Sequence, residues 1–402
     1  MNRDDIVIVS GVRTPFSKFG GALKEIHSTD LGVIVIKESL QRAGLNGEDL
    51  DELYYGMCDQ AEAALYDNVN GRQALLRAGL PNNLVSLTID RACCSSLCAV
   101  DLGRRAILLG EADTCMAVGA ENMSNTPLLI SRHRWGIGMQ PLLVQDYLNP
   151  ITYREYTPLG RDAGEIAMEY DISREEQDKW AMGSHQKWAA ADKAGRFNDE
   201  LVSVEIPQRK GDPVIFNKDE LPRPDTNMDA LSKLKTIYGS PSVTAGNAPG
   251  LDAGAAAVII MRRSQAEEKG VEPLATIVST ASGASEPRRM AELPGFVIQK
   301  ALKKADLTVD DLDIIEVNEA FAAVTLVATK ILAEREETKW RKILEKTNPN
   351  GGAIAIGHPV GASGARILMN LMYELKRRGG GYGVCGICGG LAQGDAMVIR
   401  VD

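Results

Sequence analysis

The chain is poor in histidine and aromatic residues, and it contains no long apolar run. Of its 402 residues, four are histidine and 5% are aromatic, so a histidine in an unusual segment is informative. No apolar stretch approaches the roughly 18 residues that a helix needs to cross a bilayer, and we expect no membrane span. The first ten residues lack the basic head and apolar core of a signal peptide, and the last three match no targeting tripeptide. We therefore expect a cytoplasmic protein.

Basic residues are outnumbered by acidic ones, 45 to 54. The net charge of −9 argues against a general nucleic-acid partner or a membrane-surface role, so an anionic ligand would need a local basic patch. Seven cysteines without a secretion signal favour reduced thiols over a disulfide framework. The length suggests two or three domains with ample core.

Strands and helices alternate along the chain, which indicates an α/β fold. Apolar runs closed by glycine or serine predict buried strands, and apolar residues at helical spacing predict helices. The expected strands are residues 6–9, 85–89 and 114–118, and the expected helices are residues 31–43 and 95–109.

An internal repeat supports two similar halves. Residues 34–53 align without gaps with residues 296–315, and eight of the twenty pairs are identical. Unrelated helix–turn–strand units can look alike, but the ungapped match favours duplication. At this offset of 262 residues the Cys93 segment corresponds to the His358 segment. A nucleophile from one half would then face a base from the other across a pseudo-dyad.

The middle of the chain has a different character. It carries three of the four tryptophans, charge-rich helical segments and proline-rich joints. Ser173 and Glu176 match a helix capping box. We expect a loop or cap domain that lies over the site. The predicted division is an N-terminal half of residues 1–124 plus 248–272, a cap of residues 125–247 and a C-terminal half of residues 273–402.

Cys93 stands just ahead of the helix expected at residues 95–109. The dipole and free N–H groups of a helix N-terminus favour thiolate over thiol, so Cys93 is a candidate nucleophile that takes an acyl group as a thioester. The alternative is a small buried residue, the usual fate of cysteine. We expect no metal site, because the adjacent Cys93 and Cys94 make a poor chelate.

Three further residues could complete a site. His358 lies in a run of small residues that lets the backbone approach a ligand, and it could take the proton of Cys93. Asn318 follows an apolar strand, where its amide could hold a water or an oxyanion. The alternatives are a satisfied loop histidine and a turn asparagine.

Cys388 forms a C-x-x-C pair with Cys385, which could be a redox dithiol. Its flanks predict a strand and a glycine turn, and not the helix N-terminus of a thioredoxin-like dithiol. We therefore favour a second catalytic thiol that donates a proton to a carbon atom or removes one from it. Two thiols, an imidazole and an amide suit acyl transfer with carbon–carbon bond cleavage or formation. Under oxidation Cys93 and Cys388 could also pair and switch the enzyme off.

These segments resemble the motifs of the thiolases, and the resemblance runs nearly end to end. The matching motifs are residues 92–97, 119–124, 318–321, 357–359 and 388–394. The resemblance implies that Cys93 is acylated, that His358 activates it and that Cys388 is the acid/base thiol. It implies one oxyanion site from Asn318 and His358, and another from the backbone N–H groups of Cys93 and Gly390.

The implied fold is the thiolase fold, an α/β fold with two similar α/β halves in a layered αβαβα arrangement and an inserted loop domain. The implied assembly is a homodimer or homotetramer. Residues 131–135 lie where the family has its tetramer and lid loops, and arginines there could meet a polar or acidic acyl tail.

The resemblance also places coenzyme A, as a substrate and not as a permanently bound cofactor. Residues 245–254 resemble the coenzyme A loop and include Ala248, with Pro249 where the family has a serine. Arg223 matches a position near the nucleotide, although a solvated charge is the alternative. The pocket walls implied are Leu159, in place of the usual methionine, Met290 and Phe321.

The expected reaction is the reversible, CoA-dependent cleavage of 3-oxoacyl-CoA to acetyl-CoA and a shortened acyl-CoA. One alternative is an acetoacetyl-CoA-specific acetyltransferase that works in Claisen condensation. A ketosynthase-like condensing enzyme is less favoured, because it would carry a second histidine where Asn318 stands. An inactive CoA-binding subunit is disfavoured by the intact thiols and imidazole. The sequence leaves acyl chain length, direction and oligomer size open.

Overall fold

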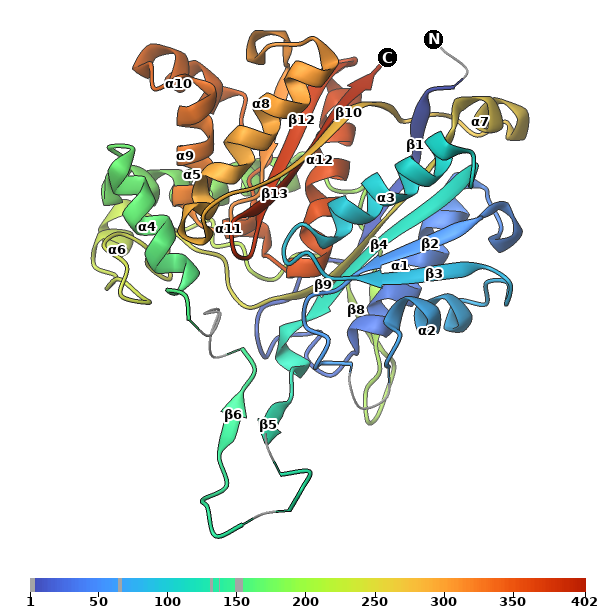
Figure 1. The fold of residues 1–402 in the computed structure, drawn as a ribbon, viewed down its shortest axis with the longest axis horizontal. Coiled ribbons are helices and arrows are strands. Elements are labelled where there is room, and N and C mark those ends of the chain that lie inside the picture. The colour runs from blue at the N-terminus through green and yellow to red at the C-terminus, as the bar shows by residue number, and fades with distance from the viewer. Residues whose placement is uncertain (1–3, 64–66, 131–132, 137, 149–154) are drawn as a thin grey trace.

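The computed structural model describes residues 4–63, 67–130, 133–136, 138–148 and 155–402. Figure 1 shows a large twisted sheet with helices on its faces and a long hairpin that projects from the body. The strands are β1 (Ile6–Arg13), β2 (Glu52–Gly56), β3 (Val85–Ile89), β4 (Thr114–Asn122), β5 (Leu128–Ile130), β6 (Val144–Asp146), β7 (Val204–Ile206), β8 (Val214–Phe216), β9 (Ala253–Arg262), β10 (Ala275–Ala284), β11 (Ile314–Val317), β12 (Gly381–Gly389) and β13 (Gln393–Val401).

The helices are α1 (Ser28–Ala43), α2 (Asn70–Arg77), α3 (Ser95–Leu109), α4 (Leu159–Glu169), α5 (Arg174–Lys193), α6 (Met228–Ser232), α7 (Arg263–Lys269), α8 (Leu293–Ala305), α9 (Ala322–Leu332), α10 (Glu337–Glu345), α11 (Ala353–Ile356) and α12 (Ser363–Arg378). The two helices predicted from the sequence, α1 and α3, end at the predicted residues. Short 3-10 turns include η1 (Gly47–Asp49), η3 (Pro287–Glu292) and η4 (Val309–Asp311). All five elements predicted from the N-terminal sequence are confirmed, although β1 and β4 run four residues further and α1 starts three residues earlier than expected.

The sheet consists of two equivalent halves. Its order is β11-β12-β13-β10-β1-β9-β4-β2-β3, so β10-β13-β12-β11 repeats β1-β9-β4-β2. The pairing senses agree, because β2 is parallel to β4 as β11 is parallel to β12, and β4 is antiparallel to β9 as β12 is to β13. Capping boxes at η1 and η4 occupy the same place in the two copies. The predicted duplication is therefore visible in the topology.

The layers follow from strands that bury both faces. In β9, Ala256, Val258 and Ile260 pack in the central core with α3 and α12, whereas their neighbours pack in a second core with α1 and α2. In the C-terminal half, α8 and α9 cover the face turned away from α12. Each half of the sheet forms one layer, so the order is helices, half-sheet, helices, half-sheet, helices, which confirms the expected αβαβα arrangement.

The segment between β4 and β9 carries β5 to β8 and α4 to α6, and it packs mainly on the C-terminal half. Helix α5 lies against α9 and α11, and α4 lies against η3 and α9. The predicted capping box is confirmed, since Ser173 accepts a hydrogen bond from the backbone of Glu176. The boundaries at residues 125 and 247 stay a prediction. In the described part of the chain, no helix is both long and apolar enough to cross a membrane.

The inserted segment is also fastened to β1 by a buried ion cluster. Arg13 Nε lies 2.7 Å from Glu200 Oε1, and its Nη1 lies 2.7 Å from Asp219 Oδ1. Buried charges of this kind need close partners to offset their desolvation. The inserted segment is thus fixed against the layer that carries the site.

Candidate active site

Cys93 lies in the turn between β3 and α3, one residue before the Cys94 cap of that helix. Ser95 shapes the turn, because its Oγ donates to Ala92 O at 2.7 Å and accepts from Arg91 N at 2.9 Å. Ala92 adopts a left-handed φ of 48°, which reverses the chain just before the thiol. The predicted place of Cys93 at a helix N-terminus is confirmed.

The thiol meets an imidazole from the other half of the molecule. Cys93 Sγ lies 3.1 Å from His358 Nε2, although 265 residues separate the two in sequence. This distance is within reach for direct proton transfer between a nucleophile and its base. The expectation that the two segments face each other across the pseudo-dyad is confirmed.

Glycine allows the His358 loop to lie directly on the N-terminal half. A Cβ on Gly361 would fall 2.8 Å from the carbonyl oxygen of Gly56 and 2.9 Å from that of Ala120, so a side chain has no room there. Gly357 has a φ of 113°, which L-residues rarely adopt. The small residues that surround His358 in the sequence therefore serve a close backbone approach.

Ser363 determines which nitrogen of His358 carries the proton. Ser363 Oγ donates to Pro359 O at 2.9 Å and lies 2.6 Å from His358 Nδ1. Because a hydroxyl has a single hydrogen, Oγ must accept the second contact, and Nδ1 must carry its N–H. In the neutral ring, the lone pair is then on Nε2, which faces Cys93. This is the tautomer that a base requires.

Burial keeps both partners neutral at rest. It lowers the pKa of His358 to about 3, with the charge of Arg366 as the second cause. Burial also raises the pKa of the Cys93 thiol well above its ordinary value, with Cys388 as the second cause. The expectation that the helix terminus favours the thiolate is wrong for the resting state, because desolvation outweighs the dipole. The imidazole must accept the proton as the thiol attacks.

Cys388 is the second thiol of the same cavity. It is 1% exposed near the end of β12, and burial raises its pKa to about 12. The Cys93 turn rests on this strand end, since a Cβ on Gly389 would lie 2.9 Å from Arg91 O. Cys93, Cys388 and Gly390 line one cavity together with His358. The structure thus brings four of the five expected catalytic residues to one space.

The C-x-x-C pair is not a dithiol. Cys385 packs in the central core, whereas Cys388 packs in the core of the outer C-terminal layer, so the two point to opposite faces of β12. All seven cysteines are unpaired. No cluster of potential metal ligands occurs among the residues that the structure describes.

Asn318 follows β11 directly, at the carboxyl end of the strand as expected. Its backbone N–H donates to Gly386 O at 3.0 Å, which places it beside the end of β12. The residue is fully buried behind the cavity wall. Its Oδ1 accepts from Arg366 Nη2 at 3.1 Å, and its Nδ2 has no partner among the described residues. The NH2 group of the Asn318 amide is therefore an unused hydrogen-bond donor.

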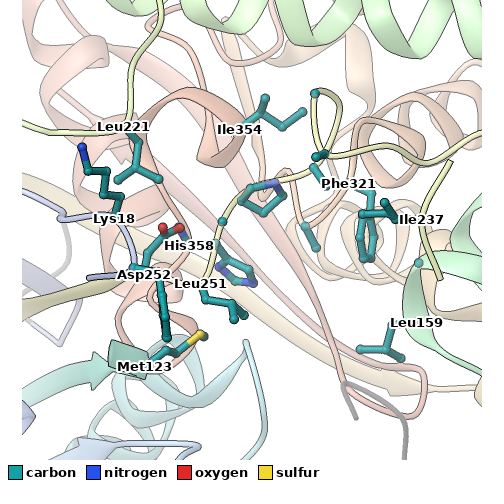
Figure 2. Close-up of a pocket in the computed structure, with 18 of the residues that line it drawn as sticks. Lys18, Met123, Leu159, Leu221, Ile237, Leu251, Asp252, Phe321, Ile354 and His358 are labelled. Atoms are coloured by element: carbon teal, nitrogen blue, oxygen red, sulfur yellow. The ribbon is translucent and has the colours of Figure 1, made fainter. Parts of the chain in front are cut away.

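The cavity has a volume of about 1140 Å³. Figure 2 shows Leu159, Ile237 and Phe321 on one side of His358, and Lys18 and Leu221 on the other. The residues expected to contact coenzyme A or the acyl group all line it: Arg223, Ala248, Pro249, Leu159, Met290 and Phe321. Of the stretch at residues 131–135, Ser131 and Arg132 lie outside the described residues.

The sequence analysis missed several residues that hold the site. Asp252 Oδ2 accepts the backbone N–H of His358 at 2.6 Å, and burial raises the pKa of this carboxyl to about 7. Glu319 accepts from Trp180, Ser184, Asn348 and the backbone of Ile354, and so joins the inserted segment to the site. A signal existed, because both acids stand among the small or apolar residues of quoted motifs.

Comparison with known proteins agrees with this geometry. The chain matches the descriptions "Thiolase, N-terminal domain" over residues 6–264 and "Thiolase, C-terminal domain" over residues 271–401. It is 42% identical to an acetyl-CoA acetyltransferase of Syntrophomonas wolfei, with 98% of this chain and 99% of the relative covered. It is 39% identical to a beta-ketoadipyl-CoA thiolase of Acinetobacter baylyi, with 98% of each covered.

The fold is similar to the crystal structure of human mitochondrial 3-ketoacyl-CoA thiolase, with a TM-score of 0.93, 36% identity and full coverage of both chains. A second structure of that human enzyme is a complex with CoA. The expected fold and class of activity, acyl transfer with coenzyme A as substrate, are confirmed. Match, fold and site lead to one conclusion: the chain belongs to the thiolase family.

Proposed function

We propose that the protein cleaves 3-oxoacyl-CoA with Cys93 as the acyl acceptor. The observation that carries the proposal is the 3.1 Å contact between Cys93 Sγ and His358 Nε2. The thiol proton moves to Nε2 as sulfur attacks the 3-oxo carbonyl. The bond between C2 and C3 then breaks, the acyl group stays on sulfur as a thioester and the electron pair leaves as the enolate of acetyl-CoA.

Cys388 completes this half of the reaction as the proton donor to C2. A thiol with a pKa raised to about 12 holds its proton at neutral pH and can give it to a carbanion. In the second half, the thiol of free CoA gives its proton to the Cys388 thiolate and attacks the Cys93 thioester. The shortened acyl-CoA is released as the Cys93 sulfur regains its proton from His358. Run in reverse, the same groups perform a Claisen condensation, and metabolite levels set the direction.

Two sets of donors would stabilise the oxyanions. The protonated Nε2 of His358 and the free Nδ2 of Asn318 would serve the thioester oxygen that becomes negative in the enolate. The backbone N–H groups of Cys93 and Gly390 would serve the oxygen of the carbonyl attacked by sulfur. Such preorganised donors supply much of the rate acceleration in acyl transfer. An amide at position 318 also counts against a ketosynthase, in which a second histidine would be expected.

Coenzyme A would enter along the inserted segment. Ala248 and Pro249 line the cavity, and Arg223 stands exposed at its rim. No ion pair engages the Arg223 guanidinium within the described residues, so this cation is available for the phosphates of the nucleotide. Pro249 has no side-chain hydroxyl or backbone N–H to offer the pantetheine arm.

We infer an apolar acyl substrate from the walls of the cavity. Leu159, Met290 and Phe321 are apolar and close to fully buried. Named relatives act on different substrates, so thiolysis should be measured with 3-oxoacyl-CoA from four carbons upward, including tail-carboxylated and aromatic ones. A preference for the four-carbon substrate alone would favour the alternative, an acetoacetyl-CoA-specific acetyltransferase.

An oligomer is proposed from two exposed apolar features. Strand β3 ends the sheet and exposes Val85 by 63% and Leu87 by 49%, which suits pairing with β3 of a second copy. The β5–β6 hairpin exposes Leu128 and Leu143 by 65% and 64%, which suits a further contact that makes a tetramer. Light scattering of the wild type and of Val85→Lys tests the first contact.

The seven unpaired thiols support a cytoplasmic location.

The decisive experiment is Cys93→Ala. We expect thiolysis of acetoacetyl-CoA to disappear, and we expect mass spectrometry to find no covalent acetyl group after incubation with acetyl-CoA. Cys115→Ala is the control, because this thiol is buried in β4 and does not line the cavity. A Cys93→Ala enzyme that still cleaves acetoacetyl-CoA would remove the nucleophile assignment.

A further inference from the structure

A buried arginine lies directly behind Asn318. Arg366 belongs to α12 and is fully buried, and its Nη2 donates to Asn318 Oδ1 at 3.1 Å. The neighbouring Glu316 carboxyl is too far away for a hydrogen bond, with Oε2 4.0 Å from Nη1. Among the described residues, Nε and Nη1 of Arg366 and both oxygens of Glu316 have no hydrogen-bond partner. A cation with so little local compensation is costly to bury, and this cost points to a role beyond packing.

The contact fixes which edge of the Asn318 amide faces the arginine. A guanidinium only donates, so it must meet Oδ1, and Nδ2 must point away from it. An amide held by no charged partner can turn over by half a rotation, because its oxygen and nitrogen have almost the same shape. That rotation would exchange a donor for an acceptor. Arg366 removes this freedom.

Asn318 and Arg366 also lie close to the reactive groups. Strands β11 and β12 are parallel with Val317 opposite Gly386, so Asn318 stands beside the end of the strand that carries Cys388. The charge of Arg366 reaches His358, where it is the second cause, after burial, of the lowered pKa of the imidazole. The arginine therefore holds Asn318 from behind the cavity wall, while its charge disfavours protonation of the nearby imidazole, and it does not itself line the cavity.

We propose that Arg366 is a positioning residue: by holding the Asn318 carbonyl, it presents the amide NH2 to the oxygen that becomes negative when the carbon–carbon bond breaks. The proposal rests on the role proposed above for Asn318. Lysine at position 366 keeps the charge but has a single ammonium on a flexible stem, and it cannot hold the amide plane as a planar guanidinium does.

A double-mutant cycle tests the proposal. Arg366→Lys is expected to lower kcat for acetoacetyl-CoA thiolysis about tenfold or more while leaving KM for CoA unchanged, since one oxyanion donor is worth up to about 100- to 1000-fold. In an Asn318→Ala background, the same Arg366→Lys change should have almost no further effect on kcat, because the group it positions is gone.

The outcomes separate the inference from the proposed function. Equal losses from Arg366→Lys in both backgrounds, or a wild-type kcat in the single variant, would overturn the positioning role and leave the chemistry of Cys93 untouched. A wild-type kcat in Asn318→Ala would instead overturn the role of Asn318, and the inference with it.

A second measurement does not need an Arg366 variant to fold. Asn318→Asp gives the arginine a carboxylate as its acceptor. Asn318→Leu keeps a side chain of similar size but offers no hydrogen-bond acceptor. We expect the aspartate variant to melt at or above the wild-type temperature with kcat lowered about 100-fold or more. The leucine variant should melt clearly lower, because it leaves the guanidinium without its acceptor. Equal melting temperatures for the leucine variant and the wild type would show that the contact between Arg366 and Asn318 does not stabilise the fold, and would overturn the proposal.

Discussion

Ser363→Ala is the sharpest test of how His358 is prepared for catalysis. The hydroxyl accepts from His358 Nδ1 at 2.6 Å and is the group that leaves the Nε2 lone pair facing Cys93. Without it, the imidazole either keeps a buried N–H with no acceptor or moves the proton to Nε2, where the ring can no longer accept the thiol proton. An unpaired buried donor costs about 1–3 kcal/mol. At 1.36 kcal/mol per tenfold change in rate, kcat/KM should fall by about 5- to 160-fold.

Two assays measure this effect. The first is the steady-state thiolysis of acetoacetyl-CoA, and the second is the rate at which iodoacetamide inactivates the enzyme, because that rate reports how readily Cys93 loses its proton. Both should fall together in Ser363→Ala. Ser39→Ala is the matched control, since it deletes an equally buried hydroxyl that donates to Ser10 Oγ at 3.0 Å in the N-terminal half. It should lower stability without lowering either rate.

The reasoning is refuted by a Ser363→Ala enzyme that keeps wild-type values in both assays. Such a result would mean that the imidazole reaches the active tautomer without the serine. A fall in thiolysis with unchanged alkylation would place the serine in the later steps instead, and the tautomer argument would be wrong.

Two further predictions concern Cys388 and Glu316. Cys388→Ala should still accept an acetyl group on Cys93 from acetyl-CoA, seen by mass spectrometry, but should cleave acetoacetyl-CoA at least about 100-fold more slowly, because the proton at C2 has no donor; full activity would contradict its role. Burial raises the pKa of Glu316 to about 8, so the folded protein keeps this proton over a range of pH in which the unfolded chain, near 4.5, has released it. Stability should therefore fall as pH rises from about 5 to 8, by about 1 kcal/mol or more from this carboxyl alone. Glu316→Gln mimics the neutral form and should melt above the wild type near pH 8 but not near pH 5; parallel melting curves at both pH values would refute the assignment.

Several parts of the fold could be predicted from the sequence because they depend on residues that are close together in the chain. Helix α3 spans the predicted residues 95–109 and ends at a glycine with left-handed φ, and the capping box at Ser173 starts α5 as expected. The repeat of residues 34–53 and 296–315 reappears as two equivalent helix–turn–strand units in a sheet of repeated order. These features depend on side-chain pattern and backbone preference within a few turns of chain.

Other features depend on contacts that no local pattern reveals. A dithiol of Cys385 and Cys388 was excluded only when β12 placed the two residues on opposite faces. The helix terminus predicted a lowered pKa at Cys93, but desolvation by the surrounding layers raises the pKa of this thiol, and desolvation is a property of the whole assembly of layers. Asp252 and Arg366 escaped notice because each acts on a residue from a different element.

The sequence by itself determined the residue types of the site, their position at strand and helix ends, and the family to which the chain belongs. Only the tertiary structure decided that Cys93 and His358, from different halves, meet at 3.1 Å, which nitrogen of the imidazole is the base, and which edge of the Asn318 amide stays free. The physical reason is that proton position and amide orientation are set by the nearest donors and acceptors in space. Those neighbours come from separate strands and helices that only packing brings together.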